Sequence, residues 1–109
     1  MQRTDFTKNI TEQLNNLNDS QLYILFDLYQ VLDTSFDFFM SEENHIKLIN
    51  FYFDRLSIKT VDSIRSLLSL AIKEYTYQFR YIDLLNIFEM MKNNYSYNQI
   101  LNNLISKYN

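Results

Sequence analysis

The sequence predicts an all-α protein, a compact bundle of five to six helices that forms a single domain over residues 1–109. Three observations predict this fold. The chain contains no Gly and no Pro, apolar residues recur at helical spacing, and helix start signals lie between the apolar segments. The hairpin turns of β-sheets depend on Gly, whereas Asn and Asp can adopt the positive backbone angles that end helices.

The first two helices are expected at about residues 5–17 and 22–32. In the first, Phe6, Ile10 and Leu14 recur every four residues and therefore share one face. The second follows Asn18, and Gln21 three positions later completes a capping-box pattern. Its apolar stripe is wide, which predicts a central helix that ends near residues 33–35 or continues to residue 40.

The next two helices are expected to begin at Ser41 and Thr60, whose hydroxyl groups can cap a helix. Glu42 and Glu43 follow the first of these and suit the positive end of a helix. Apolar residues at positions 46, 49, 53 and 56 then indicate its buried face. After Thr60, apolar residues keep helical spacing to about position 79.

The last two helices are expected at about residues 81–93 and 96–108. Ser96 and Gln99 form a second capping-box pattern at the start of the final helix. Residues 75–82 instead alternate aromatic and polar side chains, which is typical of a strand. One short strand there is the minor alternative to a helix or a helix junction, with residues 50–54 as its candidate partner.

The absence of Gly and Cys excludes several kinds of site. Glycine-rich loops that let the backbone approach phosphate cannot form, so Walker-type and dinucleotide-binding loops are ruled out. Without Cys there is no disulfide, no thiolate metal site and no cysteine nucleophile. We therefore expect no cofactor and no small-molecule substrate.

His45 is the one histidine of the chain, and it limits the catalytic and metal chemistry. Glu42 and His45 have the Glu-x-x-His spacing of di-iron helix bundles, but those sites need two such motifs. A serine or threonine nucleophile would also depend on His45 as its base. We interpret Glu42 as a helix-start acid and His45 as a surface residue, and expect neither a bound metal nor an enzyme.

A DNA-binding transcriptional regulator is one alternative, because the last helix has a polar face. Asn and Gln can read the edges of adenine, yet the phosphate contacts that supply most affinity need clustered Lys and Arg. The net charge is −3 and the basic residues are scattered, so nucleic acid is not the expected partner. The residues that would contact DNA are Asn98, Gln99, Asn102, Asn103 and Lys107.

The two halves of the chain differ in charge. Residues 1–54 contain nine acidic and three basic residues, whereas residues 55–109 contain four acidic and seven basic residues. From position 9 to position 45 there are seven acids and no Lys or Arg. Either acidic helices pack beside basic ones within the chain, or an acidic face docks on a basic surface of another protein or of a second copy.

An apolar surplus accompanies the acidic stretch, within the second helix and in residues 36–40. Aromatic and Met side chains are enriched at the cores of protein interfaces, and a surplus of exposed apolar surface marks such interfaces. A homodimer would account for the surplus without a foreign partner. The candidate partner-binding residues are Tyr23, Asp27, Asp33, Phe36, Asp37, Phe38, Phe39, Glu42 and Glu43.

The sequence thus predicts a non-enzymatic helical protein–protein interaction module. Its scarcity of Gly, Pro and Ala and its wealth of Asn, Ile, Tyr and Phe indicate an AT-rich gene, typical of phages and plasmids of low-GC bacteria. Our hypothesis is a phage- or plasmid-borne factor that inhibits or modulates a host nucleic-acid-processing complex, with a bacteriocin-immunity-type bundle as an alternative. The sequence shows no signal-peptide pattern and no membrane span, so we expect a cytoplasmic location in a bacterial host.

Overall fold

Helices account for all regular secondary structure in residues 3–50 and 60–108, the part of the chain that the computed structural model describes. The α-helices are α1 (Arg3–Asn15), α2 (Asp19–Phe36), α3 (Glu42–Leu48), α4 (Val61–Leu70), α5 (Tyr81–Lys92) and α6 (Tyr97–Tyr108). A π-helical turn, η2 (Ala71–Tyr75), continues α4, and a 3₁₀ turn, η3 (Gln78–Arg80), precedes α5. The predicted all-α bundle is confirmed.

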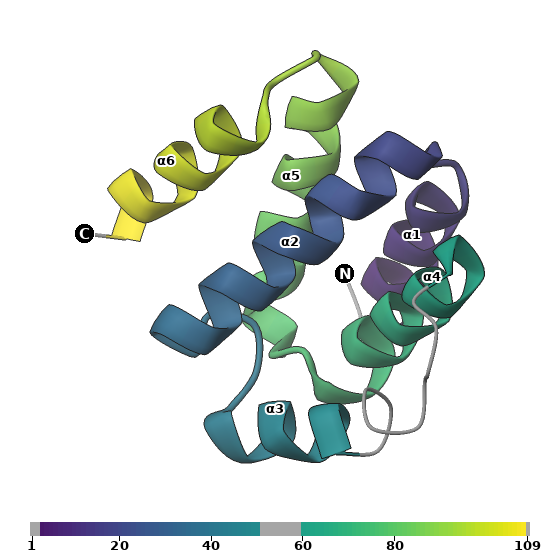
Figure 1. Ribbon diagram of the computed structural model, residues 1–109, viewed down its shortest axis with the longest axis vertical. Coiled ribbons are helices and arrows are strands. Elements are labelled where there is room, and N and C mark those ends of the chain that lie inside the picture. Colours follow the sequence, from purple (N-terminus) through teal and green to yellow (C-terminus); the bar gives the residue numbers. More distant parts are fainter. Residues whose placement is uncertain (1–2, 51–59, 109) are drawn as a thin grey trace.

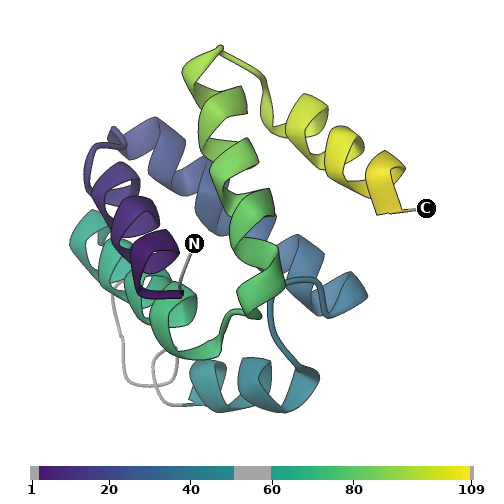
Figure 2. The ribbon, with the colours of Figure 1, turned by 180° about the vertical axis from the view of Figure 1, so that it is seen from behind.

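The central helix is α2, as its wide apolar stripe predicts. It packs on α3, α4 and α6, while α1 packs on α4 and α5. Figure 1 shows α2 crossing the front of the bundle, with α1 and α4 on one side, α6 on the other and α3 below its C-terminal end. Seen from behind in Figure 2, α1 and α5 lie in front. The radius of gyration, 13.2 Å, is that of a compact chain of this length.

Side-chain caps fix the predicted helix starts. The amide oxygen of Asn18 accepts the backbone N–H of Gln21 at 2.8 Å, and the Gln21 side chain accepts the N–H of Asn18 at 3.1 Å. The same reciprocal arrangement begins α6 at Ser96. The hydroxyls of Ser41 and Thr60 each accept the N–H three residues further on. Each cap satisfies a donor that the first turn of a helix leaves unpaired.

The positive backbone angles fall on Asp and Asn, as expected in a chain without Gly. Among the described residues, Asp37 has φ 48° and Asn94 has φ 64°. Asp37 ends α2 in the left-handed conformation, and its N–H donates to the carbonyl oxygen of Asp33 at 2.9 Å. The second helix therefore ends at Phe36, between the two expected endpoints, and the chain turns sharply after it.

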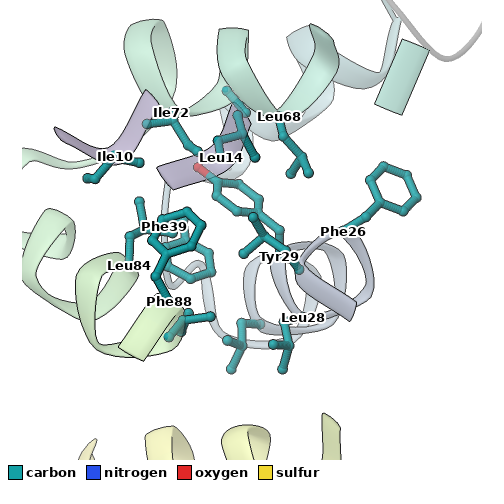
Figure 3. Packing of buried hydrophobic residues seen from close by; sticks show 14 of the residues in the cluster. Ile10, Leu14, Phe26, Leu28, Tyr29, Phe39, Leu68, Ile72, Leu84 and Phe88 are labelled. Carbon is teal, nitrogen blue, oxygen red and sulfur yellow. The ribbon is translucent and has the colours of Figure 1, made fainter. Parts of the chain in front are cut away.

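The core lies between α2 on one side and α1, α4 and α5 on the other (Figure 3). At its centre the ring of Tyr29 stacks on that of Phe39, with centroids 4.3 Å apart. The hydroxyl groups of Tyr29 and Thr76 are hydrogen-bonded, and burial raises the pKa of Tyr29. Each large apolar side chain that is removed from water stabilises the fold by roughly 1.5–3 kcal/mol. Core residues labelled in Figure 3 include Ile10, Leu14, Phe26, Leu28, Leu68, Ile72, Leu84 and Phe88.

Residues 75–82 form a helix junction, so the minor strand alternative is wrong. The end of η2 and the turn η3 occupy this segment, and its backbone bonds run mainly to residues nearby in the chain. Burial does not follow the aromatic alternation, because Thr76 and Tyr81 are buried while Phe79 is 65% exposed. Of the candidate partner strand, positions 51–54 lie outside the described residues.

The third helix buries a different residue from the one expected. Leu48 is buried, whereas Ile46 is 49% exposed. The helix is only seven residues long and packs against α2 and η2. His45 contacts Asp33, and Leu48 lines an apolar pocket together with Ile49, an expected position that is half-buried. The expected apolar positions 53 and 56 lie outside the described residues.

Candidate functional site

Three of the predicted partner-binding residues belong to the core. The side chains of Asp33, Phe38 and Phe39 are buried, with exposed fractions of 1%, 5% and 0%. The turn at Asp37 directs the chain back under α2, so the two Phe rings pack inside rather than facing solvent. These three residues are therefore not available to a partner in this structure. The predicted residues that remain exposed are Tyr23, Asp27, Phe36, Asp37, Glu42 and Glu43.

Asp33 joins α2 to α3 through a buried carboxylate. Its Oδ1 accepts the backbone N–H groups of Phe39 at 3.1 Å and Met40 at 2.8 Å. Its Oδ2 lies 2.7 Å from Nδ1 of His45. Burial raises the pKa of Asp33 from its ordinary value, and the hydrogen bonds and His45 oppose that shift. His45 is thus a partly buried partner of Asp33, not the surface residue that the sequence indicated.

A pocket of about 260 Å³ opens above this pair, between the end of α2 and the start of α3. We call it the acidic pocket, because Asp37 and Glu42 line it together with Asp33 and His45. The C-terminal end of α2 adds a partial negative charge, and its last turn contains no basic residue. The pocket is therefore suited to a cationic group.

The outward side of α2 continues from this pocket as a mixed apolar and acidic stripe. Tyr23, Asp27, Val31 and Thr34 recur at spacings of four, four and three residues and are exposed. Thr34 also lines the acidic pocket, so the stripe and the pocket are continuous. We define the acidic face as the exposed residues Tyr23, Asp27, Val31, Thr34, Glu42 and Ile46. Beside it, Glu43 pairs with Lys47 at 3.0 Å on exposed α3.

A second pocket, of about 240 Å³, lies on the other side of the end of α2, facing α6. We call it the aromatic pocket. Phe36 and Tyr108 line it and are 53% and 47% exposed, and Leu32 and Leu104 form part of its wall. Its charged lining residue is Arg80.

Arg80 is held among aromatic rings. Its guanidinium carbon lies 3.9 Å from the ring centroid of Phe38, 4.5 Å from that of Tyr108 and 4.9 Å from that of Phe79. Its Nε donates to the carbonyl oxygen of Phe38 at 2.8 Å, and its Nη1 lies 3.3 Å from Oδ2 of the buried Asp83. Cation–π contacts of this kind strengthen when the cation is shielded from water.

Sequence reasoning missed the Asp33–His45 pair and the aromatic pocket. A signal for the buried Asp33 was present, because it lies seven residues after Phe26 and four after Tyr29, on the buried face of α2. The pocket had no such signal. Phe36 and Tyr108 come from opposite halves of the chain, and only the packing of α6 beside α2 brings them together.

Thr34 approaches the Asp33–His45 pair only loosely in this structure. Nε2 of His45 lies 3.5 Å from the hydroxyl of Thr34, an order that resembles a Thr–His–Asp triad. A nucleophile and its base usually lie about 2.6–3.2 Å apart, so this contact is longer than that range. The pair instead closes a chain of contacts that fixes α3 against α2.

Metal clusters and membrane spans are not found in the parts of the chain that are described. No group of three or more His, Asp or Glu side chains gathers there to hold a metal ion. None of the described helices combines the length and apolar character needed to cross a membrane.

The polar face predicted for the DNA-binding alternative is present on α6 and is exposed. Two of its members already have partners within the chain. The Gln99 side chain accepts the N–H of Ser96 in the capping box, and Lys107 lies 3.4 Å from the carboxylate of Asp83. The remaining residues, Asn98, Asn102 and Asn103, bring no positive charge for phosphate.

Comparison of the chain with protein-family models, with curated proteins and with solved structures finds no match.

Proposed function

We propose that this chain is a non-enzymatic protein-interaction module that docks its acidic face on a basic surface of another protein. The observation that supports the proposal is the make-up of that face. Tyr23 is 42% exposed, Val31 38% and Ile46 49%, and they lie among Asp27 and Glu42. Apolar anchors surrounded by charges of one sign combine contact energy with electrostatic steering.

The electrostatics of the face favour a cationic partner group. The exposed carboxylates of Asp37 and Glu42 line the acidic pocket at the negative end of α2. No Lys or Arg occurs between positions 9 and 45, so α2 supplies no cation of its own. A Lys or Arg side chain of the partner would complete the pocket.

The composition supports a more specific role as a phage- or plasmid-borne factor that inhibits or modulates a host complex. An AT-rich gene of this kind suits a mobile element of a low-GC bacterium. Machines that process nucleic acids expose basic grooves for phosphate, which an acidic and apolar face could occupy. A net charge of −3 is too small for charge alone to hold such a complex, so Tyr23, Val31 and Ile46 would provide much of the affinity.

The test is affinity capture from a lysate of a low-GC bacterium with matched charge variants. We expect the wild type to retain a stoichiometric partner, and Asp27→Lys/Glu42→Lys to lose it by about tenfold or more through repulsion. The control is Glu12→Lys/Glu89→Lys, which changes the net charge by the same amount at exposed positions of α1 and α5, the helices at the front of Figure 2. This control variant should retain the partner. Added salt should weaken the wild-type complex.

Two results would contradict the proposal. One is that the wild type retains no stoichiometric partner. The other is that both charge variants lose it to the same extent, because the effect would then follow net charge rather than the acidic face.

A further inference from the structure

The aromatic pocket lies outside the acidic face and has a chemistry of its own. Apolar walls from α2 and α6 surround a volume of about 240 Å³, which is large enough for one aromatic ring. Phe36 and Tyr108, which line it, are 53% and 47% exposed. Aromatic residues and Arg are the residue types that most often anchor protein interfaces.

Arg80 gives this pocket a charge preference. Two of the five N–H groups of its guanidinium donate to the acceptors described above, and the side chain is 17% exposed. Lys107 lies at the same corner, and among the described residues both cations share the single carboxylate of Asp83. The pocket therefore suits an apolar ring with a carboxylate beside it.

The chain itself displays this combination. Phe36 is the last residue of α2, and Asp37 follows it in the left-handed turn. Both are exposed, and Phe36 stands on the rim of the aromatic pocket. A two-fold axis near Phe36 would let two copies exchange the same contacts, as closed homodimers do.

We propose that the aromatic pocket is a self-association site whose occupant is the Phe36–Asp37 pair of a second copy of this chain. In the dimer, each Phe36 ring packs into the pocket of the other copy, and each Asp37 carboxylate meets the Arg80 and Lys107 cations across the interface. The contact buries the exposed ring of Phe36 and brings a second carboxylate to Arg80 and Lys107. Asp37 also lines the acidic pocket, so the dimer engages one of its carboxylates, whereas Tyr23, Asp27, Val31, Thr34, Glu42 and Ile46 of the acidic face take no part in the contact.

The test is sedimentation of the full chain over a range of concentrations. We expect twice the mass of the 13.3 kDa chain at high concentration. Phe36→Ala should raise the dimer dissociation constant by about 30-fold or more, as for an anchor residue worth at least 2 kcal/mol. Asp37→Asn should raise it by about tenfold, because the charge is lost while Asn still adopts the left-handed turn.

Tyr23→Ala is the matched control, since it removes an exposed aromatic residue from the other side of α2. Tyr23→Ala should leave the dimer intact and weaken capture of the partner protein. Sedimentation thus tests the self-association site, and affinity capture separately tests the proposed function. Phe36 is exposed at a helix end, and circular dichroism of Phe36→Ala would show that the fold is kept. A chain that is monomeric throughout, or a dimer that both Phe36→Ala and Asp37→Asn leave unchanged, overturns the proposal.

Discussion

At the scale of single residues, the buried carboxylate of Asp33 connects α2 to the chain that follows it and to α3. It accepts two backbone N–H groups of the chain after α2 and contacts the imidazole of His45. Burial penalises its charged form more strongly than these partners favour it, so its pKa is raised. The folded chain therefore holds a proton on Asp33 more readily than the unfolded chain does.

This shift predicts a sign for the effect of pH on stability. The stabilisation that comes from a protonated Asp33 is present below the unfolded carboxyl pKa of about 3.9, and it is lost as the pH rises through the raised pKa of the folded state. Asp33→Asn keeps an acceptor for the two N–H groups and does not titrate. We expect the free energy of unfolding of Asp33→Asn, relative to wild type, to increase with pH above about 4, as measured by urea unfolding.

The control for this measurement is Asp62→Asn at an exposed position in the first turn of α4. It should not reproduce the change with pH. A relative stability of Asp33→Asn that falls as the pH rises would mean that the folded state favours the carboxylate, and the interpretation of Asp33 would be wrong.

At the scale of elements, helix ends are satisfied by side chains both near and far in the sequence. The beginnings of α2, α3, α4 and α6 have caps from residues next to them. The end of α1 depends on Arg65 of α4, whose Nη1 donates to the carbonyl of Leu14 and whose Nη2 donates to that of Leu17 at 3.2 Å. One guanidinium thus closes α1 and ties it to α4.

We predict that Arg65→Lys destabilises the protein by about 1–2 kcal/mol, because an ammonium group cannot match the fork of two donors. Urea unfolding would measure the loss. Lys92→Ala, which removes an exposed cation from the end of α5, should cost less than about 0.5 kcal/mol. Equal losses of unfolding free energy for the two variants would show that the contact between Arg65 and the end of α1 does not stabilise the protein.

At the scale of the whole molecule, α6 lies at the outside of the bundle (Figure 1). Among the described elements, its main contacts are with α2 and α5. Ile100 and Leu104 on its apolar face are buried. Its far end is held by Asp83 of α5, which accepts the hydroxyl of Tyr108 at 2.7 Å and lies 3.4 Å from Nζ of Lys107. This attachment also closes one side of the aromatic pocket.

Asp83→Asn should therefore loosen α6 before the rest of the fold. Hydrogen bonds that involve a charged group contribute about 1.5–3 kcal/mol, so we expect amide hydrogen exchange in α6 to accelerate by about tenfold or more. Amides of α1 and α4 should change much less. A uniform acceleration over all helices would contradict this, because it would show that α6 opens only when the whole chain unfolds.

Much of the fold could be predicted from local sequence. The capping boxes at Asn18 and Ser96, the starts at Ser41 and Thr60 and the left-handed angle at an Asp after α2 depend on residues within a few positions of one another. Less of the candidate site could be predicted. Exposed acids such as Asp27 and Glu42 were found, but the burial of Phe38 and Phe39 was not, because an aromatic run at a helix end fits either a surface or a core.

Local signals in the sequence specify that this chain is helical and where most of its helices begin, because helix propensity and capping depend on neighbouring residues. The absence of Gly and Cys excludes the chemistry that depends on them. The tertiary structure decided which helix faces meet. It turned Asp33 and His45 into a buried pair and placed Phe36, Arg80 and Tyr108 around one pocket. Helical periodicity shows that a side chain lies on a face, but the neighbour of that face is set by the packing of the whole chain.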